Sequence, residues 1–140
     1  MALVGRYLID TSAAVRMYHP EVSRRLRALL DTGVVATTAS LDAEALSAAE
    51  GFDEYEQRLA EHRTTREYLP TNDEHWHTAL GAQRALAKAG AHDAVDITDL
   101  LTAALASAHK VVVVHYDDCF ETAATVLTFQ HRWVMPRGTI

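Results

Sequence analysis

The chain has 140 residues, of which 49 % are hydrophobic and 23 % are charged, a balance typical of a globular domain and not of a disordered segment. Its 13 lysines and arginines stand against 19 acidic residues, so the formal net charge of −6 excludes nucleic-acid binding driven by an overall basic excess. The single cysteine excludes an internal disulfide and a zinc site built on several thiolates, and no run reaches the roughly 20 apolar residues that a membrane helix needs.

Predicted strands and helices alternate along the whole chain. In chain order they are a strand at 4–9, helices at 11–18 and 20–33, a strand at 34–38, a helix at 40–49, a helix that starts at 52 and ends before 70, a short edge strand at 68–72, helices at 76–90 and 97–108, a strand at 111–114, a helix at 120–127 and a terminal strand at 132–135. Pro20 suits the first turn of its helix, Ser40 is the expected N-cap of the next helix, and Gly33 and Gly90 mark helix ends.

The run of four valines at 111–114 is too uniformly apolar for a strand with one solvated face. It predicts a central parallel strand that is buried on both sides. Together with the alternation of strands and helices, it predicts one domain over residues 1–140. We expect a three-layer α/β/α sandwich around a mainly parallel sheet of four or five strands. The single cysteine and the lack of a visible secretory signal or membrane segment predict a cytoplasmic protein.

Two acidic residues each end an apolar run, Asp10 after the first strand and Asp117 after the valine strand. Because parallel strands place their carboxyl ends at one edge of a sheet, we expect these two carboxylates to meet there. Glu44 and Asp99 open helices that could reach the same edge. Clustered carboxylates repel one another unless a cation neutralises them, and Mg²⁺ or Mn²⁺ suits a site made of oxygen ligands. The sequence therefore predicts metal-dependent chemistry at this edge, with Asp10, Glu44, Asp99 and Asp117 as the candidate acids.

Each acid also has an ordinary structural interpretation. Asp10 could cap a helix, and Glu44 and Asp99 could be first-turn residues that the helix dipole favours. Asp117 could belong to a turn together with Asp118. The joint placement of all four acids favours the metal site. Residues beside them are expected to support it, and these are Thr11, Ser12, Asp96 and Asp118.

Basic residues gather on two predicted helices. A solvated helix face is the default interpretation, but these side chains are the candidates for phosphate contacts if the acidic edge cleaves nucleic acid. They are Arg24, Arg25, Arg63 and Arg66. Two other functions stay open, an aspartate-dependent phosphotransferase or phosphatase and a catalytically silent partner-binding domain. The phosphotransferase is disfavoured because Ser12 stands where its second aspartate belongs.

Four ordered segments resemble the PIN-domain family, most closely the VapC toxins of bacterial toxin–antitoxin pairs. The segments are 8–13, 41–46, 99–104 and 114–121. The resemblance implies an α/β/α sandwich, Mg²⁺- or Mn²⁺-dependent endoribonuclease activity on RNA, a homodimer, and inhibition by a VapB-type antitoxin. It also implies that the four family acids are Asp10, Glu44, Asp99 and Asp117. Cys119 stands where related toxins often carry a second aspartate, so Asp118 remains an alternative to Asp117 as the fourth acid.

Overall fold

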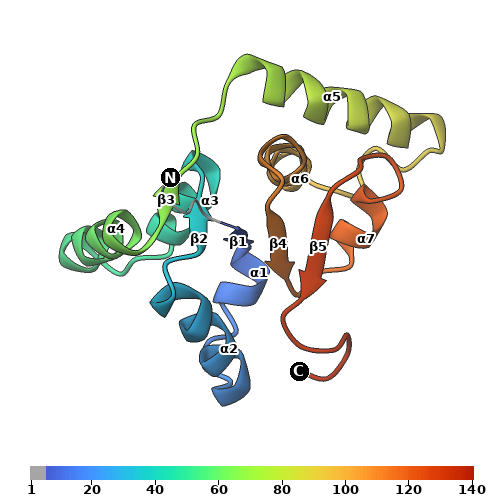
Figure 1. The fold of residues 1–140 in the computed structure, drawn as a ribbon. Helices are drawn as coiled ribbons and strands as arrows, with labels where there is room; N and C mark the ends of the chain where they lie inside the picture. Colours follow the sequence, from blue (N-terminus) through green and yellow to red (C-terminus); the bar gives the residue numbers. More distant parts are fainter. Residues whose placement is uncertain (1–5) are drawn as a thin grey trace.

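Five short strands form one sheet in the order β3-β2-β1-β4-β5, and all neighbouring strands are parallel (Figure 1). This computed structural model describes residues 6–140, so residues 4 and 5 of the predicted first strand lie outside the described part. The strands are β1 (Tyr7–Ile9), β2 (Val35–Thr37), β3 (Glu67–Tyr68), β4 (Val112–His115) and β5 (Gln130–Trp133). The predicted sheet is confirmed, with five strands and β3 at one edge.

Helices cover both faces of the sheet, as the alternation of elements predicted. They are α1 (Thr11–Ala14), α2 (Pro20–Asp31), α3 (Ala39–Ser47), α4 (Phe52–Thr65), α5 (Asp73–Lys88), α6 (Ile97–His109) and α7 (Cys119–Ala123). Successive side chains of a strand point to opposite faces. Leu8 packs in a cluster with residues of α3, α6 and α7, whereas Ile9 packs with residues of α1 and α2. None of the helices within residues 6–140 is long and apolar enough to cross a membrane.

The helix α6 is the most buried helix element of the described chain, with residues 100–106 all buried. It lies between the sheet and α5, which packs on it through Ala79, Ala82 and Leu86. Small side chains let the two helices approach closely. This packing fixes the first turn of α6, which carries Asp99, at the carboxyl edge of the sheet.

Some predicted boundaries were wrong for identifiable physical reasons. Ser40 lies inside α3, and the N-cap is Thr38, whose hydroxyl accepts the Leu41 N–H at 3.2 Å. Thr38 is fully buried at the end of β2, so the cap forms as soon as the strand ends. The first helix stops at Ala14 instead of reaching residue 18. Tighter turns follow Ala14, in which the Arg16 N–H donates to the Ala13 carbonyl at 3.0 Å, and His19 is extended because it precedes Pro20.

The C-terminal elements are shifted relative to the predictions. The helix α7 ends at Ala123 instead of continuing to residue 127, and turns follow it. The last strand covers Gln130–Trp133 instead of 132–135. Its position follows from its pairing with β4, in which Trp133 lies opposite His115. A short apolar run alone could not reveal this register.

Candidate metal centre

The strand order brings four predicted acids to one edge of the sheet. In the pairing of β1 with β4, Ile9 lies opposite Val114, and the Asp10 N–H donates to the Val114 carbonyl at 2.9 Å. Both strands therefore end together, with Asp10 beside the loop that carries Asp117. Burial, and after it the charges of the neighbouring acids, raises the pKa of Asp10 and of Asp99, so the four side chains act on one another. We call this set the acidic rim, and it consists of Asp10, Glu44, Asp99 and Asp117.

Asp10 is almost completely buried and is held by Ser12. Its Oδ2 accepts the Ser12 N–H at 3.0 Å and the Ser12 hydroxyl at 2.6 Å. Asp10 is thus the N-cap of α1, which confirms its structural interpretation. Burial raises the pKa of Asp10, the Ser12 hydrogen bonds oppose that rise, and the charges of Glu44 and Asp117 add to it.

The Ser12 hydroxyl also joins the two strand ends. It accepts the Tyr116 N–H at 2.9 Å while it donates to Asp10. One serine therefore orients a carboxylate on β1 and the backbone next to Asp117 after β4. The supporting position expected of Ser12 is thus a pair of hydrogen bonds, one to Asp10 and one to the backbone after β4.

Thr11 holds Glu44 in place across the gap between α1 and α3. The Thr11 hydroxyl donates to Glu44 Oε1 at 2.6 Å. Both residues line a cavity of about 350 Å³, whose wall also contains Arg58 and His62 of α4 and the following residue Arg66. Glu44 consequently faces a cavity beside the rim.

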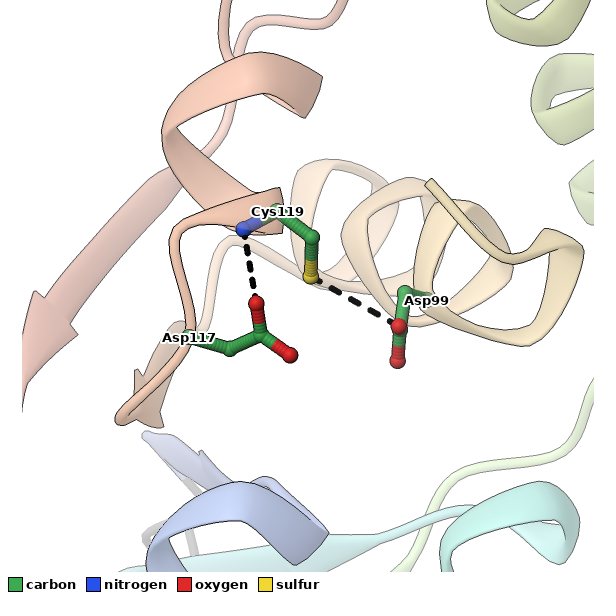
Figure 2. A group of neighbouring side chains, drawn as sticks. All are labelled: Asp99, Asp117 and Cys119. Atoms are coloured by element: carbon green, nitrogen blue, oxygen red, sulfur yellow. Dashed lines mark hydrogen bonds between the residues drawn. The ribbon is translucent and has the colours of Figure 1, made fainter. Parts of the chain in front are cut away.

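Asp99, Asp117 and Cys119 form the tightest group of potential ligands in the described chain (Figure 2). One ligand atom from each lies within 4.8 Å of the others. Asp117 Oδ1 accepts the Cys119 N–H at 2.9 Å, and the Cys119 thiol points at Asp99 Oδ2 at 3.5 Å. Burial, followed by the charge of Asp10, raises the pKa of Asp99 to about 7. Burial and the nearby carboxylates raise the pKa of Cys119, so the thiol keeps its proton and donates.

Two predicted supporting acids lie apart from this group. Asp118 is the N-cap residue of α7, and its Oδ1 is paired with the Arg137 guanidinium at 2.7 Å. Asp96 occupies the N-cap position of α6, where its side chain makes no capping hydrogen bond. The geometry thus favours Asp117 over Asp118 as the fourth acid.

Three of the four arginines expected to contact phosphate are paired with glutamates of their own helix region. Arg24 and Arg25 both pair with Glu21 on α2, and Arg25 also donates to the Val134 carbonyl at 2.9 Å. Arg66 pairs with Glu61 on α4. Arg66 and Arg63 line another hollow, of about 510 Å³, beside β2 and β3.

A chain of hydrogen bonds behind Asp117 was not evident from the sequence. The Asp117 N–H donates to His115 Nδ1 at 3.2 Å, so the proton of the neutral imidazole is on Nε2. That nitrogen lies 2.9 Å from His131 Nδ1, which must accept. His131 Nε2 then lies 3.6 Å from Glu121 Oε1. Burial and the neighbouring His131 lower the pKa of His115 to about 4, which keeps it neutral at pH 7.

The donor set of the rim fits a hard divalent cation. The acids supply carboxylate oxygens, and burial together with the neighbouring negative charges raises the pKa of Asp10 and Asp99, an ionisation cost that a bound cation relieves. Mg²⁺ and Mn²⁺ prefer these ligands. The one sulfur nearby is a protonated thiol, which leaves the carboxylates as the charged donors.

Comparisons with known proteins agree with this geometry. The family model described as PIN domain matches residues 7–126. The chain is 37 % identical over 137 residues to "Ribonuclease VapC21" of Mycobacterium tuberculosis, which covers 98 % of this chain and 99 % of the relative.

Solved structures show the same fold. A DNA-bound VapBC from Salmonella typhimurium matches with a TM-score of 0.71 at 16 % identity, over 94 % of this chain and 100 % of the other. VapBC-5 from Mycobacterium tuberculosis, described as a member of a family of toxin-antitoxin systems, matches with a TM-score of 0.56 at 28 % identity, over 94 % and 98 %.

Proposed function

The chain belongs to the PIN-domain family, and we propose on that premise that it is an Mg²⁺- or Mn²⁺-dependent endoribonuclease of the VapC type. It acts as the toxin of a bacterial toxin–antitoxin pair. The observation that carries the proposal is the convergence of the acidic rim at one sheet edge, where burial and mutual repulsion raise the pKa of Asp99 to about 7. The relatives named as ribonucleases match along almost the whole chain, which supports the same activity here.

The acids of the rim have different roles in the proposed reaction. Asp10, Asp99 and Asp117 hold one or two divalent ions. Glu44, fixed by the Thr11 hydroxyl, orients the attacking water or contributes to a second ion site. Ser12 keeps Asp10 in its binding orientation. A bound divalent ion lowers the pKa of water and offsets the charge that develops on the phosphodiester.

The proposed partner protein is based on the solved structures that share this fold. We infer that a VapB-type antitoxin neutralises the enzyme, because the similar solved structures are VapBC complexes. A homodimer and a cytoplasmic location complete the proposal. Sedimentation of the purified toxin, alone and with the antitoxin, tests both the dimer and the complex.

The direct test is cleavage of RNA by the purified protein in the presence of Mg²⁺ or Mn²⁺. Asp10→Asn and Asp99→Asn each should lower the rate more than about 100-fold, because a carboxylate ligand is lost. Asp31→Asn, an exposed change at the end of α2, is the matched control. Full activity of Asp99→Asn, or undiminished cleavage in EDTA, would reject the assignment. A silent partner-binding domain would neither cleave RNA nor bind Mn²⁺ in calorimetry.

A further inference from the structure

A second cavity lies on the other side of the rim. It has a volume of about 470 Å³ and opens beside Asp117, between α1, the end of β5 and the segment that follows β5. Figure 1 shows this segment passing below the carboxyl ends of β4 and β5. The cavity shares no lining residue with the 350 Å³ cavity that contains Glu44.

Two adjacent residues of α1 connect the rim to these separate spaces. Thr11 lines the cavity of Glu44, and Ser12 lines the cavity beside Asp117. An extended chain that crosses the rim would therefore have one neighbouring unit on the Thr11 side and the other on the Ser12 side. A polynucleotide with its scissile phosphate at the rim has this shape.

The walls of the second cavity combine two guanidinium groups with two aromatic rings. The Arg16 guanidinium lies 4.7 Å from the centre of the Tyr116 ring, and that of Arg137 lies 5.9 Å from the Trp133 ring. The Tyr116 and Trp133 rings meet edge to face, with centres 5.3 Å apart. We call this space the Arg16 pocket. Aromatic surfaces beside arginines are what proteins use to stack bases of single-stranded RNA and to bind the linking phosphates.

The guanidinium groups of Arg16 and Arg137 differ in how far their positive charge is already neutralised by a partner. Arg16 donates to the Ser12 carbonyl at 2.6 Å, a neutral partner that leaves the positive charge of the guanidinium uncompensated by that bond. Arg137 is paired with Asp118, but the two side chains are 66 % and 59 % exposed, so the pair is readily exchanged for a phosphate. In a chain of net charge −6, attraction of RNA has to be local, and this pocket supplies it next to the rim.

We propose that the Arg16 pocket binds the nucleotide adjacent to the scissile phosphate of a single-stranded RNA. Arg16 and Arg137 contact its phosphate, and Trp133 stacks on its base. The inference rests on the proposed ribonuclease function and adds the site at which the enzyme binds the nucleotide next to the scissile phosphate. The pocket is proposed in place of Arg24, Arg25, Arg63 and Arg66, which the sequence offered only as candidates beside the default of a solvated helix face.

The first test measures binding of a fluorescein-labelled single-stranded RNA by anisotropy, in EDTA so that cleavage does not interfere. Arg16→Ala should weaken binding about tenfold and reduce the slope of log Kd against log salt by about one. Trp133→Leu should weaken binding by about tenfold or more through lost stacking, with little change in the salt slope. Arg84→Ala, which removes an exposed arginine of α5, is the control for charge alone.

A variant that is expected to bind RNA more tightly distinguishes a role in binding from a loss of binding through misfolding. Asp118→Asn releases Arg137 and removes a negative charge from the pocket wall, so RNA should bind more tightly. Steady-state cleavage completes the test, since Arg16→Ala should raise KM much more than it lowers kcat. The inference is overturned if Arg16→Ala, folded by circular dichroism, binds RNA as Arg84→Ala does, or if Asp118→Asn fails to tighten binding.

The two proposals fail in different ways. If the wild-type protein cleaves no RNA with either ion, the ribonuclease function is wrong. If it cleaves RNA and the Arg16 and Trp133 variants match the control, only the pocket assignment is wrong.

Discussion

Thr11 and Glu44 are joined by a 2.6 Å hydrogen bond although they are 33 positions apart in the chain. The bond runs from the hydroxyl at the start of α1 to a carboxylate on α3, so it fixes one side chain of the rim relative to Asp10 next to Thr11. Glu44 taken alone looked like an ordinary first-turn residue. Its fixed orientation beside a cavity supports a catalytic role.

Replacement of Thr11 by valine tests this relationship. The valine keeps the shape of the side chain but removes the donor, so Glu44 can rotate away from the rim. We expect RNA cleavage to fall about 10- to 100-fold, the usual cost of losing a residue that orients a ligand or catalytic group. Thr32→Val, at the exposed end of α2, is the matched control. Equal activity of both variants would contradict an orienting role for Thr11.

Asp117 and Asp118 can be separated by their effect on metal affinity. Asp117 lies in the ligand group with Asp99, whereas Asp118 is paired with Arg137. Calorimetric titration with Mn²⁺ should therefore show at least about tenfold weaker binding for Asp117→Asn and nearly wild-type binding for Asp118→Asn. The reverse order would make Asp118 the fourth acid.

Asp99→Asn should stabilise the metal-free protein at alkaline pH. Burial, with the charge of Asp10, raises the pKa of Asp99 from 3.8 to about 7 in the folded chain. The folded state therefore holds this proton more tightly than the unfolded chain, and stability is lost as the pH rises from about 4 to 7. At pH 8 the free energy of unfolding of the variant should exceed that of the wild type by about 1–2 kcal/mol, a range reduced because the Asp99 side chain is partly exposed.

Thermal unfolding in EDTA checks the sign of this effect. The melting temperature of Asp99→Asn should exceed that of the wild type clearly at pH 8 and by less at pH 5, where Asp99 is protonated in the folded protein. A difference that is independent of pH would show that ionisation of Asp99 is not its cause.

His131 provides a test of the hydrogen-bond chain behind Asp117. His131→Asn keeps an acceptor near the position of Nδ1, whereas His131→Leu removes it and leaves the buried His115 Nε2–H without its partner. The leucine variant should bind Mn²⁺ about tenfold more weakly, and the asparagine variant should recover most of the affinity. If the two variants bind the ion equally well, the chain does not position Asp117.

Local patterns were sufficient to predict the parallel sheet and the approach of Asp10 and Asp117 at one of its edges. The valine run at 111–114 predicted a central parallel strand. Because the carboxyl ends of parallel strands lie at one edge of the sheet, Asp10 and Asp117 were expected to lie close together. These inferences need only the period of the apolar residues and the rules of sheet topology.

Contacts between distant segments could not be predicted in the same way. The Tyr116 N–H bond to Ser12, the pairing of His115 with His131 and the position of Trp133 all depend on the exact strand register. Thr38 displaced Ser40 as a cap because the end of β2 is buried, which a list of cap residues does not reveal. Sequence reasoning did not single out Arg16, because its contact with the Tyr116 ring joins two segments that are far apart in the chain.

The bond between Tyr116 and Ser12 spans 104 positions and has a consequence for biosynthesis. While the ribosome is still making the early helices, the nascent polypeptide holds only part of the acid set. The missing part arrives with β4, which has to emerge from the exit tunnel and dock against β1. The acidic rim is therefore complete only after this docking step.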